Sequence, residues 1–198
     1  PDKTIEEGTI VQSNIIWGTK AVRYLFGKNG ITGLANVAIS PQTIARIGAS
    51  LGAFFGPGKK TAVSCDGHPG NAMLKHGIIS GLLSTGLEVF DLGPLTTPVM
   101  RYSVKRLGLN SGIHLFASKK ENSHIHVVDY TGNNLSPASE RRIENLYIRD
   151  DYPRKDFQNI KPVNSLYDIP TFYIRYLLDG IDTQVFNSKN YRILVSTR

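Results

Sequence analysis

Ser118 is the side chain best placed for chemistry in this sequence. It follows a short apolar run, residues 112–117, and opens the polar stretch 118–123. β-Branched and aromatic residues in a run too short for a helix predict a buried strand. Open parallel sheets bind ligands just beyond the carboxyl ends of their strands. A serine hydroxyl at the end of such a strand is therefore well placed to react with a bound ligand. The alternative is a turn residue whose hydroxyl bonds its own backbone.

A second loop of this kind, residues 66–70, follows a predicted strand over residues 61–65. His68 in this loop could serve as a catalytic base or as a ligand for phosphate, because imidazole exchanges protons and donates hydrogen bonds near neutral pH. A histidine that caps a turn or faces solvent explains the same residue equally simply. The sequence leaves both interpretations open.

The elements that must position these loops alternate between strand and helix. Ser40, Thr97 and Ser136 each precede a proline, as N-cap residues at helix starts do. The order of the elements predicts right-handed crossovers and an α/β fold with a mainly parallel sheet. The apolar pattern predicts helices over residues 41–54, 71–85, 97–107 and 137–148, and strands over 61–65, 87–92, 112–117 and 126–129.

Paired glycines mark the second of these helices. Gly77 and Gly81 lie one turn apart, and Gly86 is expected to end the helix in a left-handed conformation. Each glycine inside a helix costs roughly 1 kcal/mol relative to alanine. Close packing against the sheet is the expected compensation.

Composition excludes several classes of protein. The chain has 198 residues, 40% of them hydrophobic, which is enough for one ordinary core. A single cysteine, Cys65, excludes an internal disulfide framework, and the apolar segments are too short to span a bilayer, so we expect a soluble, cytoplasmic protein without a membrane partner. The net charge of +7 is spread along the chain, which favours phosphorylated small molecules over nucleic acid as ligands.

The two ends of the sequence differ from this pattern. Residues 4–17 carry a six-residue apolar recurrence, which is typical of a left-handed parallel β-helix, although an edge strand or chance explains it as well. Residues 149–170 are polar and contain proline, and a helix over 171–181 precedes a strand at 191–195 that lacks a partner. We therefore divide the chain into the end of a β-helix or linker (1–20), an α/β domain (21–150), a linker (151–170) and the start of a truncated second domain (171–198).

Three loops carry motifs of a known family. Residues 26–33, Phe-Gly-Lys-Asn-Gly-Ile-Thr-Gly, resemble the opening Phe-Gly-Thr-Asp-Gly-Ile-Arg-Gly of the α-D-phosphohexomutase family. Residues 64–68, Ser-Cys-Asp-Gly-His, fall where this family has Gly-Arg-Asp-x-Arg, and residues 116–121, Phe-Ala-Ser-Lys-Lys-Glu, fall where it has Thr-Ala-Ser-His-Asn-Pro. The resemblance covers residues 24–198 and implies the family's first domain, a three-layer α/β/α sandwich with a mainly parallel sheet.

This family includes phosphomannomutase, phosphoglucomutase and phosphoglucosamine mutase, and its members transfer a phosphoryl group within hexose phosphates. The serine of the third motif gives its phosphoryl group to a hexose monophosphate, and the bisphosphate intermediate returns the other phosphate. The resemblance implies Mg²⁺ as cofactor, contacted by the phosphate of Ser118 and held mainly by three aspartates of a second domain. It implies Ser118 as phosphoryl carrier, Lys119 and Lys120 as its catalytic neighbours, and Lys28, Asn29, Asp66 and His68 as the substrate and phosphate loops.

The loops depart from the family pattern at its cationic positions. Thr32 stands where the family has arginine in the first loop, and Cys65 and His68 replace both arginines of the second. Neither threonine nor cysteine offers the charged, fork-shaped donor that suits phosphate. Residues 119–121, Lys-Lys-Glu, replace His-Asn-Pro, and two ammonium groups would pair with a phosphoserine but repel Mg²⁺.

Three functions remain open. The first is a working phosphohexomutase of carbohydrate metabolism, in which Lys119 or Lys120 stabilises the charge of phosphorylated Ser118. The second is a catalytically degenerate module that binds a hexose phosphate or sugar nucleotide and regulates a fused, mannose-1-phosphate guanylyltransferase-like domain. Residues 14–18 resemble such fusions, in which a nucleotidyltransferase and a left-handed β-helix precede a phosphomannomutase-like module. The third, a nucleotide- or nucleic-acid-binding domain, lacks a glycine-rich motif that opens a helix after the first strand.

The chain is expected to be inactive by itself. The family's Asp-Gly-Asp-x-Asp-Arg metal loop and its sugar-recognition loops lie in later domains, and no such aspartate cluster occurs in the 198 residues. The remaining domains of a parent chain are therefore the expected partners. Without them apolar surface would be exposed and the strand at 191–195 would be unpaired, so we expect a homodimer or strand exchange through residues 191–195.

Overall fold

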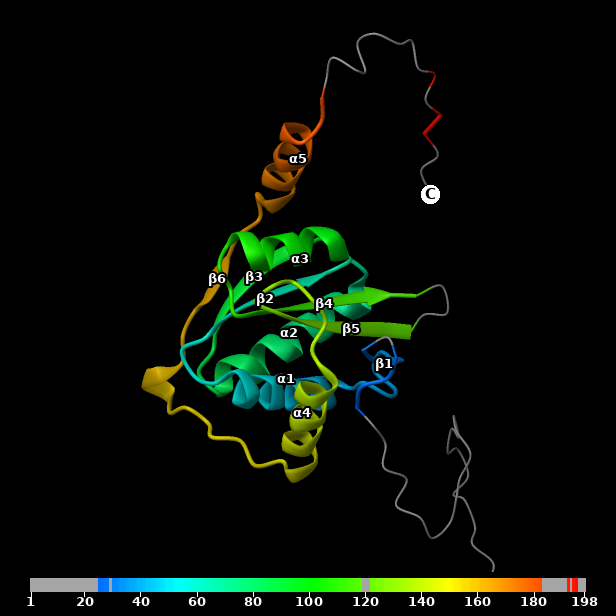
Figure 1. Ribbon diagram of the computed structural model, residues 1–198. Helices are drawn as coiled ribbons and strands as arrows, with labels where there is room; N and C mark the ends of the chain where they lie inside the picture. The colour runs from blue at the N-terminus through cyan, green and yellow to red at the C-terminus, as the bar shows by residue number, and fades with distance from the viewer. Residues whose placement is uncertain (1–24, 29, 119–121, 183–191, 193, 196–198) are drawn as a thin grey trace, which may run out of the picture.

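The computed structural model describes residues 25–28, 30–118, 122–182, 192 and 194–195. The predicted β-helix coil and residues 191 and 193 of the predicted strand at 191–195 lie outside the described residues, and the described residues 192, 194 and 195 are not in a strand. The described part is a sheet with helices on both faces, in which α1, α2 and α4 lie on one side and α3 on the other (Figure 1). This arrangement confirms the predicted three-layer α/β/α sandwich.

The sheet has six strands in the order β1-β5-β4-β2-β3-β6. The inner strands β2, β3 and β4 are joined in parallel, and β6 is parallel to β3, whereas β5 is antiparallel to both β4 and β1. The sheet is therefore mixed and mainly parallel, as predicted. The strands are β1 (Ile31–Leu34), β2 (Lys60–Cys65), β3 (Glu88–Pro94), β4 (Ser111–Ala117), β5 (Asn122–Asp129) and β6 (Val163–Ser165).

The helices begin at the predicted serine-proline signals. The Ser40 hydroxyl accepts a hydrogen bond from the N–H of Thr43 at 3.1 Å, and Ser136 accepts one from Ser139 at 3.2 Å. The third helix differs, because its N-cap is Thr96 rather than the predicted Thr97. The helices are α1 (Pro41–Phe55), α2 (Pro69–Ser84), α3 (Thr97–Arg106), α4 (Pro137–Arg149) and α5 (Ile169–Asp179), with a short 3-10 helix, η1 (Phe157–Asn159).

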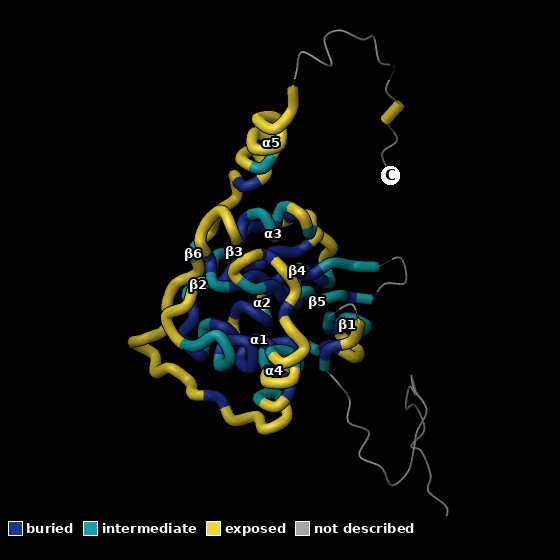
Figure 2. Tube along the Cα trace, in the orientation of Figure 1, coloured by how far each residue is buried: buried dark blue, intermediate teal, exposed yellow. Residues whose placement is uncertain are grey.

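Two apolar layers hold the sandwich together, one on each face of the sheet (Figure 2). The larger layer lies between the sheet and helices α1 and α2, and the smaller lies under α3. Alternation along β4 separates them, since Ile113 and Leu115 belong to the first layer while Gly112 faces Met100 and Val104 of α3. The side of the sheet that α3 covers thus carries the even-numbered residues of β4.

The paired glycines of α2 pack against α1 and not, as predicted, against the sheet. A methyl group on Gly81 would overlap the carbonyl oxygen of Ala45 and would lie 2.7 Å from the backbone nitrogen of Ala49. A methyl group on Gly77 would lie 2.5 Å from the side chain of Ile44. The two helices therefore approach backbone to backbone, which explains the glycines.

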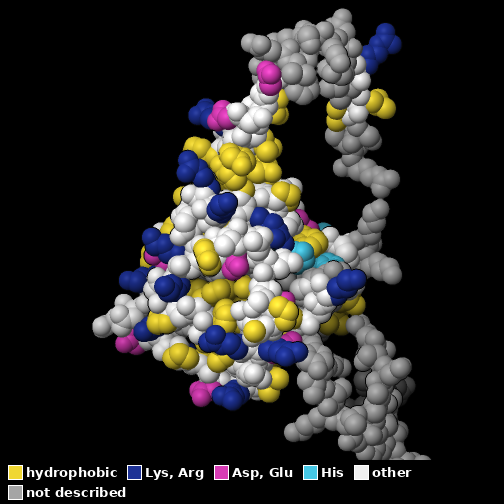
Figure 3. Space-filling view, viewed as in Figure 1, with side chains coloured by type: hydrophobic (Ala, Val, Ile, Leu, Met, Phe, Trp, Pro, Cys, Tyr) yellow, Lys and Arg dark blue, Asp and Glu magenta, His cyan; other side chains and the backbone are white. Residues whose placement is uncertain are grey.

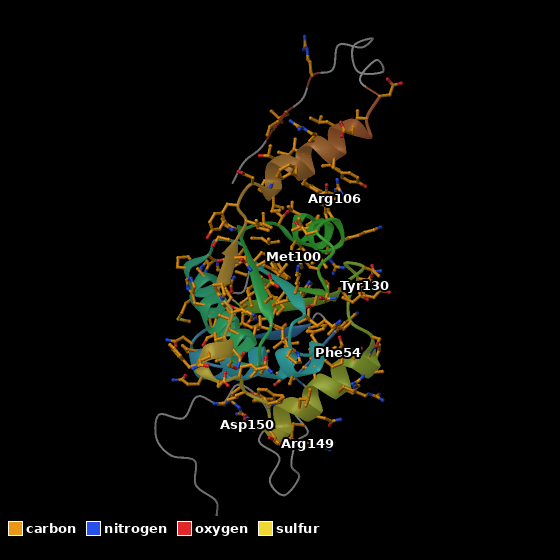
Figure 4. The ribbon with its side chains drawn as sticks, turned by 90° about the vertical axis from the view of Figure 1, so that its left-hand side faces the viewer. Phe54, Met100, Arg106, Tyr130, Arg149 and Asp150 are labelled. Atoms are coloured by element: carbon orange, nitrogen blue, oxygen red, sulfur yellow. The ribbon has the colours of Figure 1, made fainter. Side chains whose placement is uncertain are left out.

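Helix α4 packs against α1, and two cationic side chains take part in the contact. Arg46 donates to Asp150 at 3.1 Å, and the guanidinium of Arg142 lies 5.2 Å from the ring centre of Phe54. Figure 4 shows Phe54 beside α4, with Arg149 and Asp150 at the end of that helix. Asp150 has a left-handed φ of 54°, which ends α4.

The sequence predicted a loop and a linker where the structure has edge strands. Residues 31–34, expected in a glycine-rich loop, form β1, and residues 163–165, expected in a linker, form β6 beside β3. Strand β5 also begins at Asn122, four residues before the predicted start. All three corrections concern pairing between distant segments, which local sequence patterns do not encode.

Candidate functional site

Ser118 lies at the carboxyl end of β4, as predicted. Its backbone N–H donates to the carbonyl of Asn122 at 2.9 Å, so the β4–β5 pairing continues one step beyond the last residue of β4. The side chain is half-buried. Its expected neighbours Lys119 and Lys120 lie outside the described residues.

Asp66 ties the loop after β2 to the Ser118 loop. Its carboxylate accepts hydrogen bonds from the N–H of Ala117 at 2.6 Å, from the N–H of His68 at 3.0 Å and from the amide of Asn71 at 3.0 Å. Burial would raise the pKa of this carboxyl, but the three hydrogen bonds outweigh it and hold the pKa below its usual range. Asp66 is therefore an ionised anchor of both loops.

His68 caps helix α2. Its Nδ1 accepts a hydrogen bond from the N–H of Gly70 at 3.2 Å, and its backbone N–H points to Asp66. The turn-capping interpretation of the sequence is thus confirmed. The imidazole is exposed, so the cap leaves the rest of the ring open to solvent at the same edge of the sheet as Ser118.

The first motif is brought to Ser118 by the unpredicted strand β1. Phe26 is buried and its N–H donates to Glu144 of α4 at 3.0 Å, while Lys28 is exposed and Asn29 lies outside the described residues. In β1, Thr32 lies opposite His124 of β5, and its hydroxyl is 3.1 Å from Nδ1 of that histidine. Thr32 therefore contacts a neighbouring imidazole at the position where the family pattern has arginine.

Sequence reasoning missed the ring cluster next to Ser118. The ring of Phe116 stacks on His114 at 5.7 Å and on His124 at 5.1 Å, and it meets the ring of His126 edge-on at 4.7 Å. We call these four side chains the imidazole face. The alternating patterns His114-x-Phe116 and His124-x-His126 could have revealed it, because residues two apart on a strand share a face.

His114 is the buried end of the imidazole face. Its Nδ1 is 2.8 Å from the hydroxyl of Ser64 in β2. Burial lowers the pKa of His114 to about 4; the Asp66 carboxylate opposes this lowering and His126 adds to it. His114 is therefore neutral at physiological pH and acts as a structural partner of Ser64.

The described residues do not form a complete metal site. Among them no group of three or more His, Cys, Asp or Glu side chains is placed to hold a metal ion. Both carboxylate oxygens of Asp66 already accept hydrogen bonds from protein donors. The residues at this edge therefore do not by themselves fit the Mg²⁺ that the family resemblance implies.

A separate open groove of about 650 Å³ lies between α3 and α5. Tyr102 of α3 packs against Tyr173 and Tyr176 of α5, with ring centres 5.1 and 4.8 Å apart. Further apolar side chains of α5, Phe172, Ile174, Leu177 and Leu178, are exposed, and Figure 3 shows hydrophobic side chains gathered at the base of the helix. None of the residues predicted for the site lines this groove.

Known proteins match both the sequence and the fold. Residues 23–154, more than half of the chain, match the family described as phosphoglucomutase/phosphomannomutase, alpha/beta/alpha domain I. The chain belongs to this family. In this phosphoglucomutase/phosphomannomutase domain, Ser118, Asp66 and Thr32 therefore lie at one edge of the mainly parallel sheet.

Relatives of this phosphoglucomutase/phosphomannomutase domain are longer proteins. A phosphoglucosamine/phosphogalactosamine mutase of Sulfurisphaera tokodaii is 30% identical over 174 residues, which cover 86% of this chain and 38% of that protein. A phosphoglucosamine mutase of Lactobacillus johnsonii is 31% identical over 174 residues, covering 83% of this chain and 39% of that protein. The chain thus spans less than half the length of the relatives it matches.

Solved structures agree on the fold. A phosphoglucomutase/phosphomannomutase family protein from Burkholderia thailandensis superimposes with a TM-score of 0.66 at 17% identity, over 80% of this chain and 36% of that one. The phosphoglucomutase parafusin from Paramecium gives a TM-score of 0.61 at 13% identity, over 80% and 35%. Within the described residues, no helix is both long and apolar enough to cross a membrane.

Proposed function

We propose that this chain is the phosphoserine-bearing domain of a phosphohexomutase. The observation that carries the proposal is the position of Ser118, at the carboxyl edge of the sheet in a loop that Asp66 anchors through Ala117. Phosphoryl transfer depends chiefly on positioning and on stabilising charge, and an anchored loop favours the first of these.

In the proposed reaction, a hydroxyl oxygen of a hexose monophosphate bonds to phosphorus as the bond from phosphorus to Ser118 Oγ breaks. The proton of the attacking hydroxyl leaves to a base, and Ser118 Oγ takes up a proton as it is released. The reverse sequence, with the other phosphate of the bisphosphate, restores the phosphoserine. The result is an isomerised hexose phosphate.

Side chains near Ser118 receive roles within this proposal. Lys119 and Lys120 neutralise negative charge on the transferring group, and Lys28, exposed in the first loop, attracts the substrate phosphate. Asn29 adds a polar contact in the first loop. Asp66 and His68 fix the second loop. Mg²⁺, when bound, supplies further charge neutralisation, and we assign its main ligands to parts of the protein other than the described residues.

One observation favours the second candidate, a catalytically degenerate module that binds a phosphosugar or sugar nucleotide and regulates a fused nucleotidyltransferase. Thr32 bonds His124, Cys65 is buried, and His68 caps α2, so the three positions where the family has arginine supply no guanidinium here. Such a module would keep ligand binding and lose turnover, and its β-helix-like stretch would be its link to the fused domain.

The two candidates are separated by following phosphate on Ser118. The natural full-length protein is incubated with glucose 1,6-bisphosphate and Mg²⁺, and phosphopeptide mapping with intact mass locates the label. A label on Ser118 that moves to added glucosamine, glucose or mannose 6-phosphate supports the mutase. The names of the two relatives make the glucosamine phosphate the first choice.

The matched control is Ser80→Ala, which removes an exposed hydroxyl from α2 and should leave labelling unchanged. Ser118→Ala should abolish labelling. Absence of label on Ser118 in a protein that still binds the sugar phosphate would overturn the mutase and leave the regulatory module. We further propose a cytoplasmic location and the remaining domains of a parent chain as partners.

A further inference from the structure

The imidazole face lies on the open part of the sheet beside Ser118. His114 pairs in register with His126, and Phe116 pairs with His124, so all four rings point to one face. Gly112 and Val128, two residues further along on the same face, are covered by α3. The rings of Phe116, His124 and His126 lie beyond that cover and are half-buried.

Ser118 belongs to the same face by alternation. The hydrogen bond from its N–H to Asn122 continues the β4–β5 ladder, which makes His124 its diagonal neighbour across the strands. Diagonal neighbours in an antiparallel pair are about 7–8 Å apart at Cα. A phosphate group that reaches Ser118 is therefore within range of the His124 side chain.

Thr32 fixes one side of His124. Its hydroxyl lies 3.1 Å from Nδ1, and Phe116 holds the ring plane by stacking at an interplanar angle of 13°. When the hydroxyl donates to Nδ1, the ring proton of neutral imidazole resides on Nε2. The ring then holds its Nε2–H donor in a fixed orientation, and the acceptor for this donor is a group other than Thr32.

We propose that the imidazole face binds the phosphate group of the phosphosugar that lies next to Ser118, which in the mutase is the group being transferred, with His124 Nε2 as donor and Thr32 as the residue that orients it. This inference rests on the part of the proposed function that both candidates share, the binding of a phosphosugar at the Ser118 edge. It gives the domain a phosphate contact in addition to the lysines of its arginine-free loops.

The charges around the face suit an anion. Lys28 is exposed in the loop that leads into β1, and His68 is exposed at the cap of α2. His114 is buried against Ser64, so it positions Phe116 and does not contact the ligand. Asp66 carries the opposing charge, but its oxygens already accept from Ala117, His68 and Asn71.

Binding is measured on the Ser118→Ala background, where phosphoryl transfer cannot occur. Glucosamine 6-phosphate, inorganic phosphate and glucosamine without phosphate are titrated into ¹⁵N-labelled protein, and the imidazole nitrogens are followed by NMR. We expect both phosphate ligands to shift Nε2 of His124 while glucosamine alone does not. His124→Phe, which keeps the stacking and removes the donor, should weaken binding by about tenfold.

Four further variants make the test specific. His124→Gln, which restores an N–H donor at similar reach, should recover part of the affinity, and Thr32→Val should weaken binding where Thr32→Ser does not. His76→Phe alters an exposed histidine of α2 and should change nothing. Equal affinity of His124→Phe and the parent, with amide spectra showing both folded, would overturn the inference even if Ser118 is phosphorylated. Binding that depends on His124 would support the inference even if Ser118 is never labelled, in which case only the mutase function would fail.

Discussion

The carboxylate of Asp66 accepts a hydrogen bond from the backbone N–H of Ala117, the residue immediately before Ser118, at 2.6 Å. Asp66 follows β2 and Ala117 ends β4, so this contact joins two loops that are distant in sequence. Asp66 also accepts from His68, the N-cap of α2. One carboxylate therefore anchors the backbone immediately before Ser118 and the N-cap residue of α2.

Asp66→Asn should loosen the Ser118 loop. An amide offers one acceptor oxygen where the carboxylate has two, and its NH₂ group would face a donor. We expect a loss of roughly 1–2 kcal/mol in unfolding free energy, with faster amide exchange at Ala117 and His68 and weaker labelling of Ser118. Hydrogen exchange by NMR checks this. Asp129→Asn, at the end of β5 that is remote from Ser118, is the matched control and should leave exchange at Ala117 unchanged.

The buried His114 should make the fold sensitive to mild acid. Burial lowers its pKa from 6.5 to about 4, so as the pH falls the unfolded chain takes up this proton before the folded protein does. The contribution of neutral His114 to the free energy of unfolding is complete above pH 6.5 and is lost progressively as the pH falls from about 6.5 to 4. The total loss should be roughly 2–4 kcal/mol.

Urea denaturation at a series of pH values measures this loss. His114→Gln should be less stable at neutral pH but should lack this part of the pH dependence. His76→Gln, at an exposed histidine, should retain it. A stability of the parent that stays constant from pH 6.5 to 4.5 would contradict the assignment.

The sequence was sufficient for the parts of the fold that local signals specify. Ser40 and Ser136 with their following prolines located two helix starts, and Gly86, with a φ of 89°, ended α2 as predicted. It also placed Ser118 at the end of a strand. These features depend on neighbouring residues alone, which is why one sequence predicts them.

The missed features depend on contacts between distant segments. β1 has only four residues and contains Gly33, and it is a strand because β5 pairs with it. The bond from Thr32 to His124 and the stacking of His124 on Phe116 follow from the same pairing. A single sequence does not give the register of such pairs, so the imidazole face could be recognised only once the sheet was assembled.

The isolated chain should self-associate. α5 exposes Phe172, Ile174 and Leu178, each more than half accessible, on a helix that is apolar on most sides. Exposed apolar surface of this kind favours association. Sedimentation equilibrium should show an average mass that rises with protein concentration. The double variant Ile174→Glu/Leu178→Lys should weaken this association. Val37→Glu, at an exposed valine outside α5, should leave the association unchanged. A concentration-independent monomer would rule out the predicted homodimer, whether through α5 or through residues 191–195.

Gly81→Ala should destabilise the domain although alanine is the better helix former. The added methyl group would overlap the carbonyl of Ala45 and crowd the backbone nitrogen of Ala49, so α1 and α2 would have to separate. We expect a net loss of roughly 2–4 kcal/mol, against the gain of about 1 kcal/mol in helix propensity. Ser80→Ala, at the preceding exposed position, should leave the unfolding free energy nearly unchanged or slightly higher.

Lys75 of α2 and Asp91 of β3 form a buried ion pair. The Lys75 Nζ lies 2.9 and 2.7 Å from the two carboxylate oxygens, and both side chains are about one-tenth exposed. Asp91 also accepts from the N–H of Gly93 at 2.9 Å. Lys75→Met should therefore cost about 3–5 kcal/mol in unfolding free energy, because it leaves a buried carboxylate without its counter-charge.

Asp91→Asn in the same chain should recover much of that loss, since the neutral amide can still accept from Gly93 and no longer needs a cation. The double-mutant cycle, measured by urea denaturation, gives the coupling between Lys75 and Asp91 directly. Asp150→Asn breaks the surface pair with Arg46, whose side chains are 50% and 43% exposed, and should cost no more than about 1 kcal/mol. Equal effects of Lys75→Met and Asp150→Asn would show that burial does not set the strength of the Lys75 pair.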